Sequence, residues 1–556
     1  MDAIEGDFVL VDKADIEGLP TKPDAGRAED KPSRRPIEER AKERQERQEK
    51  QKSVERWLND EGGHLGKFPA KTHARKVAKQ LGNPRGLICL PGQETSTFED
   101  SDMGPEFRQR RYFYYLAGVD FPGCCVTYEM PYDWLVLWIP ITDARRFLWY
   151  GSTPGPEECL AMSHVDEVRY IGGLERYLTA SLAPGRALAP GSTLYVLHPN
   201  QTPRMENYKG VVQVDTASLK PAMNAARVIK TDFEVAMIKR ANAISGAAHK
   251  AVMTRLKRLS NEREIEAIFR GVCRAHGAKH QAYPVIAGSG VNASTLHYDS
   301  NDQPLEGRQL VCLDAGTEWK CYASDITRTM PLNGTFSPEA AEIHAIVERM
   351  QAECFKRVLP GVTFASLHVQ ACIVAVEELL RLGILQNGTA EEILARGTVA
   401  AFFPHGLGHH VGLEVHDSSG SQPLLAGYLS VPRTSGMVGK RGCITDEAAA
   451  RMWREVVVAR DHHSMMVVPV QAKQRLEKNM VVTVEPGIYF CRPYLEEWFF
   501  KNANHAKHIN KEVVEKYYPV GGVRIEDCIA ITDKGFDNLT SAPKGEEMLK
   551  IINSGY

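Results

Sequence analysis

Residues 310–331, LVCLDAGTEWKCYASDITRTMP, decide the fold of the second half of the chain. The apolar run LVCL predicts a buried strand that ends at Asp314. Ala315 and Gly316 can turn, and the pieces that follow are also strand-like, so strand pairing would bring Asp314 close to Asp325. Two ionised carboxylates in a buried site repel each other unless cations neutralise them. Acids beside turns are commonly turn formers or caps, so this stretch alone leaves a metal site and a plain turn as alternatives.

Two further acids end apolar runs downstream. Glu485 closes the run VVTVE, and Glu526 lies in GVRIED, where the period of two places it on the same strand face as Arg524. A carboxylate buried at the end of a strand is costly without a cation. These two runs therefore predict two more acids that need a positive partner.

Four histidines lie within residues 405–416, in the sequence HGLGHHVGLEVH. His405 and His409 are four residues apart, but the glycines between them make a regular helix unfavourable. Glycine allows close backbone approach, so an irregular turn that delivers one imidazole to a site is expected, with His416 following at strand spacing. One imidazole with four acids is an oxygen-rich ligand set, which suits hard divalent ions such as Mn²⁺ better than a tetrahedral, sulfur-rich zinc site.

The surrounding sequence predicts two globular parts. Residues 61–222 alternate short apolar runs with helical patterns, which predicts an α/β domain. Residues 223–556 carry helical patterns near 232–256, 260–276, 337–358 and 364–382 together with the strands above, and without strict βαβ alternation this predicts an α+β domain.

Composition excludes several classes of protein. The chain has 556 residues, a formal charge of −2 and 43% hydrophobic residues, so neither nucleic-acid binding nor membrane binding is expected. The 12 cysteines show no CxxC or disulfide pattern, and the acidic N-terminus does not look like a secretory signal, which predicts a cytoplasmic protein. Residues 1–60 are highly charged and lack an apolar stripe, so a solvated extension is expected there.

The ordered motifs LDAGTEWKCYASDITRTMP, HGLGHHVGLEVHD, VVTVEPGIY and GVRIEDC resemble those of the pita-bread metallopeptidases, in the branch of Xaa-Pro aminopeptidases and prolidases. The resemblance spans about 225–545. Residues 67–220 resemble that branch's N-terminal domain, and the opening GKFPAKTHARKVAKQL resembles fungal members.

The resemblance implies a site as well as a fold. It assigns five metal ligands for two Mn²⁺ ions per subunit and four residues to catalysis, Glu485 among them as the proton shuttle and His297 and His416 as substrate contacts. Arg524 would orient the substrate or support the ligands, and His405 would support His409. The ligands are Asp314, Asp325, His409, Glu485 and Glu526, and the catalytic residues are Glu485, His416, His297 and Arg524.

The implied activity is that of an Xaa-Pro aminopeptidase, a homodimeric hydrolase that acts on proline-containing peptides. A prolidase restricted to Xaa-Pro dipeptides is the alternative within the class. An inactive binding protein of the same fold is a remote alternative, because all five ligand positions are filled.

The chain departs from the family pattern between His409 and Glu485. These residues are 76 positions apart, which is long for the family and predicts an insertion, or retained non-coding sequence, within 420–470. Arg433 and Arg441, candidates to grip the carboxylate of a dipeptide, fall in this segment, so the sequence leaves aminopeptidase and prolidase open. The His462–His463 pair there is expected to lie on the surface.

Overall fold

The computed structural model describes residues 66–82, 85–141, 144–182, 193–203, 213–425 and 474–554. The predicted extension at 1–60, most of the predicted insertion at 420–470, Arg433, Arg441 and the His462–His463 pair lie outside these residues, and the statements on them stay predictions.

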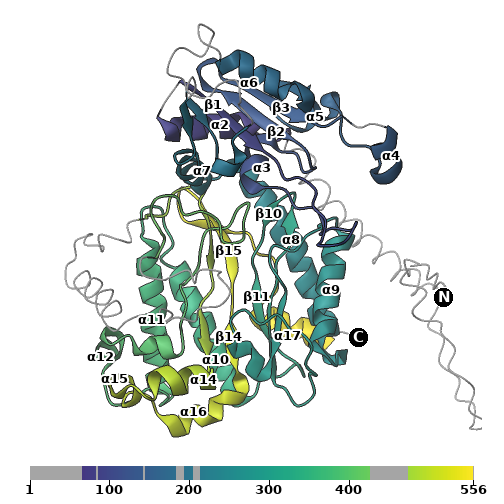
Figure 1. Cartoon of the computed structure of the whole chain (residues 1–556). Helices are drawn as coiled ribbons and strands as arrows, with labels where there is room; N and C mark the ends of the chain where they lie inside the picture. Colours follow the sequence, from purple (N-terminus) through teal and green to yellow (C-terminus); the bar gives the residue numbers. More distant parts are fainter. Residues whose placement is uncertain are drawn as a thin grey trace, which may run out of the picture. The chain divides into compact units, whose positions relative to one another are not determined.

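The N-terminal part is built on a six-stranded sheet with the order β4-β3-β2-β1-β5-β6 (Figure 1). Strand β2 pairs antiparallel with β1 and with β3, whereas β5 pairs parallel with β1, β6 with β5, and β4 with β3. The sheet is therefore mixed, and β4 is a strand that the sequence patterns did not predict. The strands are β1 (Gly86–Pro91), β2 (Cys125–Glu129), β3 (Trp134–Ile139), β4 (Glu167–Tyr170), β5 (Thr193–Tyr195) and β6 (Gln213–Asp215).

Helices flank this sheet because their apolar faces need a partner surface. Residues from α2 and α3 share one core with β1, β2 and β3, while α6 covers Trp138 and its neighbours in a second core. The helices are α2 (Ala70–Leu81), α3 (Arg111–Ala117), α4 (Ala144–Tyr150), α5 (Pro156–Met162), α6 (Leu174–Leu182) and α7 (Leu219–Val228).

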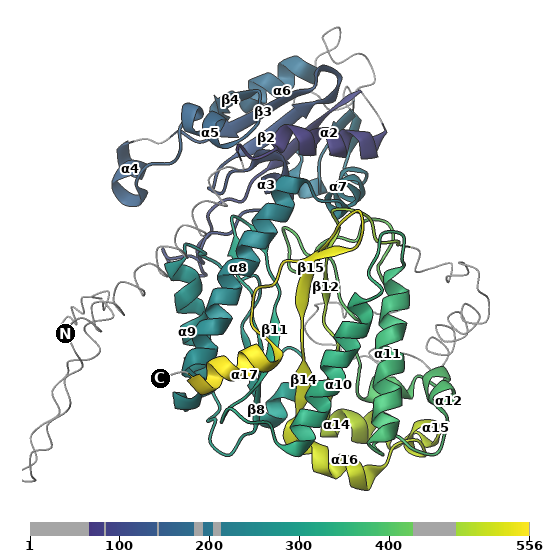
Figure 2. The ribbon, with the colours of Figure 1, turned by 180° about the vertical axis from the view of Figure 1, so that it is seen from behind.

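The C-terminal part combines long helices with short antiparallel sheets. Thr231 caps α8 and Asn261 caps α9 through side chains that accept backbone N–H groups of the first turn, the arrangement that satisfies otherwise unpaired donors. Helix α8 packs against α9 and α17, and α10 packs against α11 (Figure 2). The main helices are α8 (Asp232–Arg255), α9 (Glu262–Ala275), α10 (Pro338–Phe355), α11 (Phe364–Arg381) and α17 (Gly545–Ser554).

The strands of this part form three sheets that meet at the candidate site, β11-β8-β7, β12-β15-β16 and β13-β14, all antiparallel. A short hairpin of β9 and β10 joins β8 to β11. The strands are β7 (Ile286–Ser289), β8 (Leu310–Asp314), β9 (Glu318–Trp319), β10 (Tyr322–Ala323), β11 (Thr327–Pro331), β12 (Val481–Val484), β13 (Gly487–Tyr489), β14 (Gly522–Arg524), β15 (Asp527–Ile531) and β16 (Phe536–Asn538).

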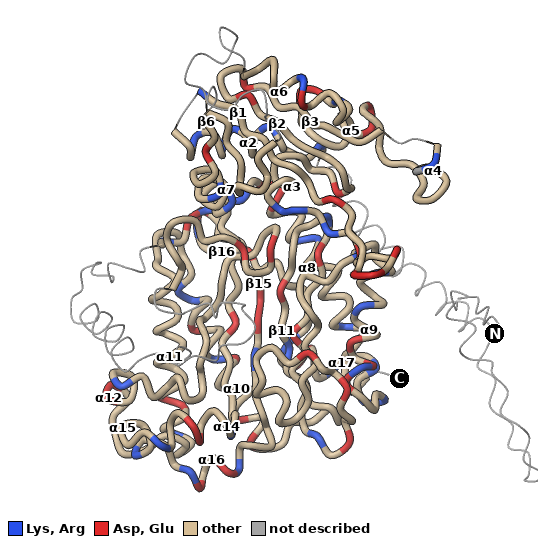
Figure 3. Tube along the Cα trace, viewed as in Figure 1, with Lys and Arg blue, Asp and Glu red and all other residues tan. Residues whose placement is uncertain are grey.

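Two hydrophobic cores support these sheets from their helical side. One core joins α10 and α11 to β12, β13 and β14, and the other joins α8, α9 and α17 to β7, β8 and β11. Acidic and basic residues are interspersed along the chain (Figure 3), which agrees with the formal charge of −2. Since the helices cover one side of these sheets, the carboxylates at the strand ends can gather on the side that the helices leave open.

Candidate metal centre

Asp314 and Asp325 meet because the strands that carry them are paired. Asp314 is the last residue of β8 and stands opposite Thr327, two residues after Asp325. The Ala315 N–H donates to the Ile326 carbonyl at 3.0 Å, which continues the pairing of the two segments beyond Asp314. A Cβ on Gly316 would lie 2.0 Å from the Ser324 carbonyl oxygen, so glycine allows the two segments to approach closely there. The turn predicted at Ala315 and Gly316 is therefore wrong: the chain stays paired there and reverses at Lys320 and Cys321, between β9 and β10, where both residues have positive φ.

Glu485 and Glu526 face each other across a second pair of strands. Glu485 follows β12, Glu526 precedes β15, and the ladder pairs Val484 with Asp527. The Glu526 N–H donates to the Thr327 carbonyl at 3.1 Å, and the Thr327 hydroxyl donates to Glu526 Oε2 at 2.7 Å. These bonds join the second acid pair to the strand that follows Asp325.

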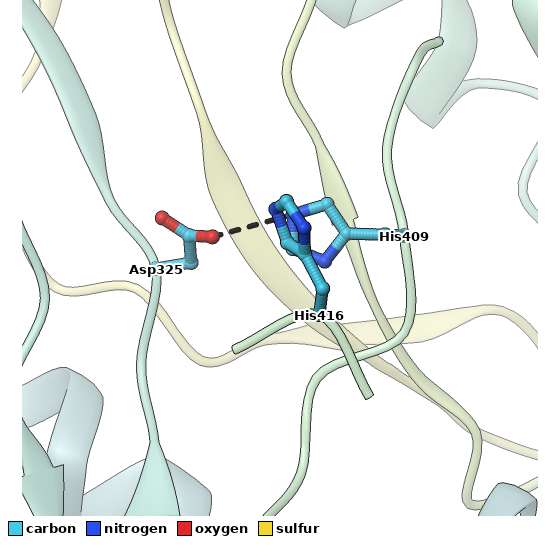
Figure 4. A group of neighbouring side chains, drawn as sticks. All are labelled: Asp325, His409 and His416. Carbon is cyan, nitrogen blue, oxygen red and sulfur yellow. Dashed lines mark ion pairs between the residues drawn. The ribbon is translucent and has the colours of Figure 1, made fainter. Parts of the chain in front are cut away.

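His409 is delivered by an irregular loop that lies against β12. Its N–H donates to the Thr483 hydroxyl at 3.0 Å, and the Thr483 N–H donates to the His409 carbonyl at 2.9 Å. A Cβ on Gly408 would lie 2.2 Å from the Thr483 carbonyl oxygen, so the glycine allows this close approach. The centroids of the His409 and His416 rings are 4.0 Å apart, and the Asp325 carboxylate points toward both rings (Figure 4).

The potential ligand atoms fall into three overlapping groups, and within each group the atoms lie within 4.8 Å of one another. Glu526 belongs to the second and third groups, so two adjacent triads are linked through one carboxylate. The groups are Asp325 with His409 and His416, His409 with Glu485 and Glu526, and Asp314 with Asp325 and Glu526.

The acids of this cluster hold protons unequally when no cation is present. Burial, with the nearby charge of Asp314, raises the pKa of Asp325 to about 6. Burial and the charges of Asp325 and Glu485 raise the pKa of Glu526 well above its ordinary value. Burial also acts to raise the pKa of Glu485, but the hydrogen bond and charge of His409 outweigh it and lower that pKa to about 2. The cluster is thus short of positive charge.

Two observations show that the site fits a metal ion. Among the described residues, Glu526 Oε1 is buried and has no hydrogen-bond partner. His409 Nδ1 lies 3.0 Å from the His410 carbonyl oxygen, which can only accept, so Nδ1 carries the proton. His409 Nε2 faces Asp325 and Glu485, each at 3.3 Å. Burial acts to lower the pKa of His409, but the hydrogen bonds and charges of these two acids outweigh it and raise that pKa well above its ordinary value, so without a metal a proton on Nε2 serves both carboxylates. Two carboxylates and one imidazole nitrogen that converge in this way suit a divalent cation with oxygen and nitrogen ligands, which would take the place of that proton.

Arg524 contacts the ligand cluster directly. Its guanidinium donates to Asp314 Oδ2 at 2.6 Å and to the Tyr489 hydroxyl at 2.8 Å. The Tyr283 hydroxyl donates to the other oxygen of Asp314 at 2.7 Å. Arg524 is 3% exposed, so it orients Asp314 from within the protein, which is the supporting alternative for this residue.

Sequence reasoning missed four residues that hold the cluster in place, namely Thr327, Thr483, Tyr283 and Tyr489. The two threonines could have been found, since each lies two residues from a predicted ligand and therefore on the same strand face. Tyr283 is 31 residues from the acid that it contacts, and no local pattern marks it.

The remaining predicted histidines lie at the edge of the cluster. His416 and His297 are both exposed, and a charge on His297 contributes to lowering the pKa of His405, after the larger effect of burial. His405 Nε2 lies 2.8 Å from the Tyr489 hydroxyl, so its recorded partner is Tyr489 rather than His409. His410 is 1% exposed and its Nε2 lies 2.9 Å from the Gln474 side-chain oxygen, which is a structural contact.

Both parts of the chain match the sequence profiles of known protein families. The sequence profile of metallopeptidase family M24 matches residues 236–533, and that of the aminopeptidase P N-terminal domain matches residues 70–188. The chain belongs to metallopeptidase family M24. Two similar proteins are both named as probable Xaa-Pro aminopeptidases. That of Sordaria macrospora is 52% identical over 90% of this chain and 88% of its own length. That of Colletotrichum graminicola is 53% identical over 88% of this chain and 92% of its own length.

Solved structures agree on the fold. Escherichia coli aminopeptidase P in a low-pH form superimposes with a TM-score of 0.66 at 24% identity, over 88% of this chain and 99% of the other. The same enzyme with the inhibitor Pro-Leu gives the same values. The expected α+β pita-bread domain, preceded by an α/β N-terminal domain, is confirmed, as is the resemblance to fungal members. In the described part of the chain, no helix is both long and apolar enough to span a membrane.

Proposed function

We propose that this M24 metallopeptidase is a dinuclear Xaa-Pro aminopeptidase, which releases the N-terminal residue from peptides with proline in second position. The observation that carries the proposal is the pair of donor triads linked through Glu526. The similarity to fungal proteins named as probable Xaa-Pro aminopeptidases supports the substrate class. We further propose that Asp314, Asp325, His409, Glu485 and Glu526 bind the two metal ions.

Manganese is the proposed metal, because four carboxylates and one imidazole form a hard ligand set. Two divalent ions bound there would acidify an attacking water, polarise the scissile carbonyl and stabilise the negative charge that develops on its oxygen. Four carboxylates carry the charge that two such ions balance.

The proposed proton carrier is Glu485. Its side chain is 16% exposed, whereas Glu526 is 1% exposed, so Glu485 is the carboxylate that an entering water or peptide can reach. The Thr483 hydroxyl donates to Glu485 Oε1 at 3.1 Å and fixes the carboxylate. Glu485 would accept a proton from the water and pass it to the leaving proline nitrogen.

His416 and His297 are the proposed substrate contacts. Both are exposed, His416 lies in one group with Asp325 and His409, and an imidazole N–H can donate to a peptide carbonyl or to the oxygen on which charge develops. Arg524 is buried against Asp314, and we propose that it acts on the substrate only through the orientation of that carboxylate.

The second candidate function within the family is that of a prolidase. The two activities differ in whether a basic side chain blocks the site beyond proline and binds the free carboxylate of a dipeptide. A homodimer and a cytoplasmic location complete the proposal.

The experiment compares an Xaa-Pro-Yaa tripeptide, the matched Xaa-Pro dipeptide and an Xaa-Ala-Yaa tripeptide, with the Mn²⁺-loaded protein. We expect hydrolysis of the first, with the alanine peptide at least about tenfold worse, the effect of one pocket contact on the proline ring. Cleavage of the dipeptide alone would establish the prolidase. Full activity after complete metal removal would refute the dinuclear mechanism.

A further inference from the structure

The two strands that carry Glu485 and Glu526 are interrupted at these acids. The ladder pairs Val484 with Asp527 on one side and Gly487 with Arg524 on the other, which leaves two residues on each strand between the sheets. The Glu485 N–H donates to the Leu407 carbonyl at 2.8 Å, and that of Glu526 donates to the Thr327 carbonyl. The acids thus hydrogen-bond to neighbouring segments instead of to each other's strand.

The Ile525 N–H donates to the Pro486 carbonyl across the break at 3.3 Å, but the Ile525 carbonyl needs another donor, because buried peptide groups are almost always paired. Pro486 lies within the break and has no N–H to offer. The residues directly before the acids, Val484 and Ile525, are both fully buried, so water does not supply the donors.

Gln351 of α10 donates to one carbonyl on each of the two strands. Its side-chain Nε2 donates to the Val484 carbonyl at 3.0 Å and to the Ile525 carbonyl at 3.3 Å. Its Oε1 accepts from the Lys544 ammonium at 2.7 Å, which fixes the orientation of the amide, since an ammonium can only donate. Gln351 is 2% exposed, so no part of this amide turns to solvent.

The environment of Lys544 extends the same support. Lys544 and Arg328 both form ion pairs with the buried Asp527, and Arg328 also donates to the Glu526 carbonyl at 2.7 Å. Hydrogen bonds from Gln351 and Arg328 thereby hold the peptide units on either side of Glu526.

We propose that Gln351 is a positioning residue of the metal centre, whose one amide holds the backbone before Glu485 and before Glu526 at a fixed separation. This inference rests on the proposed function, since it assigns the two acids to one dinuclear site. The hydrogen bonds of the Gln351 side chain go to two backbone carbonyls and to Lys544, so it acts on the two acids through the carbonyls that precede them. Changes to groups that orient metal ligands typically lower metal affinity about 10- to 100-fold.

The test compares Gln351→Met, which keeps the length of the side chain but has no N–H donor, with Met350→Ala. Met350 is the preceding residue of α10 and fully buried in the same core, so its truncation lowers stability without touching either carbonyl. Melting temperature without metal and the Mn²⁺ dissociation constant from titration calorimetry are measured for both variants and for the wild type.

We expect Gln351→Met to bind Mn²⁺ at least about tenfold more weakly than the wild type, with much of its turnover restored at saturating Mn²⁺. Met350→Ala should melt at a lower temperature yet bind Mn²⁺ as the wild type does. Wild-type affinity in folded Gln351→Met would overturn the proposal. If Gln351→Met does not fold, Gln351→Glu, which also lacks the N–H donors, takes its place; failure of both to fold would show general stabilisation instead of positioning.

The wild-type measurements keep the two proposals apart. A wild type that binds no Mn²⁺ pair, or that leaves Xaa-Pro-Yaa peptides uncut, would refute the proposed function before any variant is compared. A wild type that passes both tests, together with unchanged affinity in Gln351→Met, would refute only the positioning role.

Discussion

Replacing one acid of the metal centre should stabilise the metal-free protein at neutral pH, although it should strongly lower the activity of the metal-loaded enzyme. The acid is Asp325. When no metal is bound, burial and the nearby charge of Asp314 raise its pKa from 3.8 to about 6. The folded form therefore holds this proton more tightly than the unfolded chain does. Stability of the metal-free protein falls as pH rises from about 4 to about 6, and stays low above that range.

The magnitude follows from the pKa. Each pH unit between the two values is worth about 1.36 kcal/mol, so ionised Asp325 costs the metal-free protein about 3 kcal/mol at pH 7. Asp325→Asn removes this charge at nearly constant volume. In a chain of this size the gain corresponds to a melting temperature higher by about 2–3 °C at pH 7, and to little difference near pH 4, where Asp325 is protonated.

The assay is calorimetric melting of the wild type and Asp325→Asn after chelation and dialysis, at several pH values between 4 and 7. Asp537→Asn serves as the control, because Asp537 is an exposed acid far from any ligand group and its loss changes the net charge equally. With Mn²⁺ restored, the order should reverse, since the wild type regains its ligand and the variant does not. A metal-free Asp325→Asn that melts below the metal-free wild type at pH 7 would refute the reasoning.

Three further predictions concern the proposed roles. Glu485→Gln should lower turnover by at least about 100-fold, because a proton carrier and a ligand are lost together; near-normal turnover measured with Xaa-Pro-Yaa would remove Glu485 from that role. His416→Ala should lower turnover but keep its bound Mn²⁺, as measured by elemental analysis, and metal loss would place His416 among the ligands. A chain that begins at Gly63 should keep its specific activity and metal content, since residues 1–60 have no apolar face to pack; a collapse of either would show that the segment docks.

The four acids of the proposed ligand set could be read from the sequence because each stands at or near the end of a strand, where local patterns are strong, whereas His409 lies in an irregular loop. The apolar runs before Asp314 and Glu485 form β8 and β12, and the helical pattern that begins near residue 232 forms α8 (Asp232–Arg255). In these cases a few consecutive residues contain all the information that the local structure needs.

The supports of the site depended on the tertiary structure alone. Arg524 and Asp314 are 210 residues apart, and Gln351 lies 133 and 174 residues before the carbonyls that it binds. In the sequence Gln351 is one polar residue within an amphipathic helix, and nothing near it distinguishes it from a solvent-facing residue. Periodicity records which face of an element is buried, but which distant groups meet there is decided by how the helices pack on the sheets. The sequence therefore determined which residues could bind metal, while packing between remote segments determined how they are held.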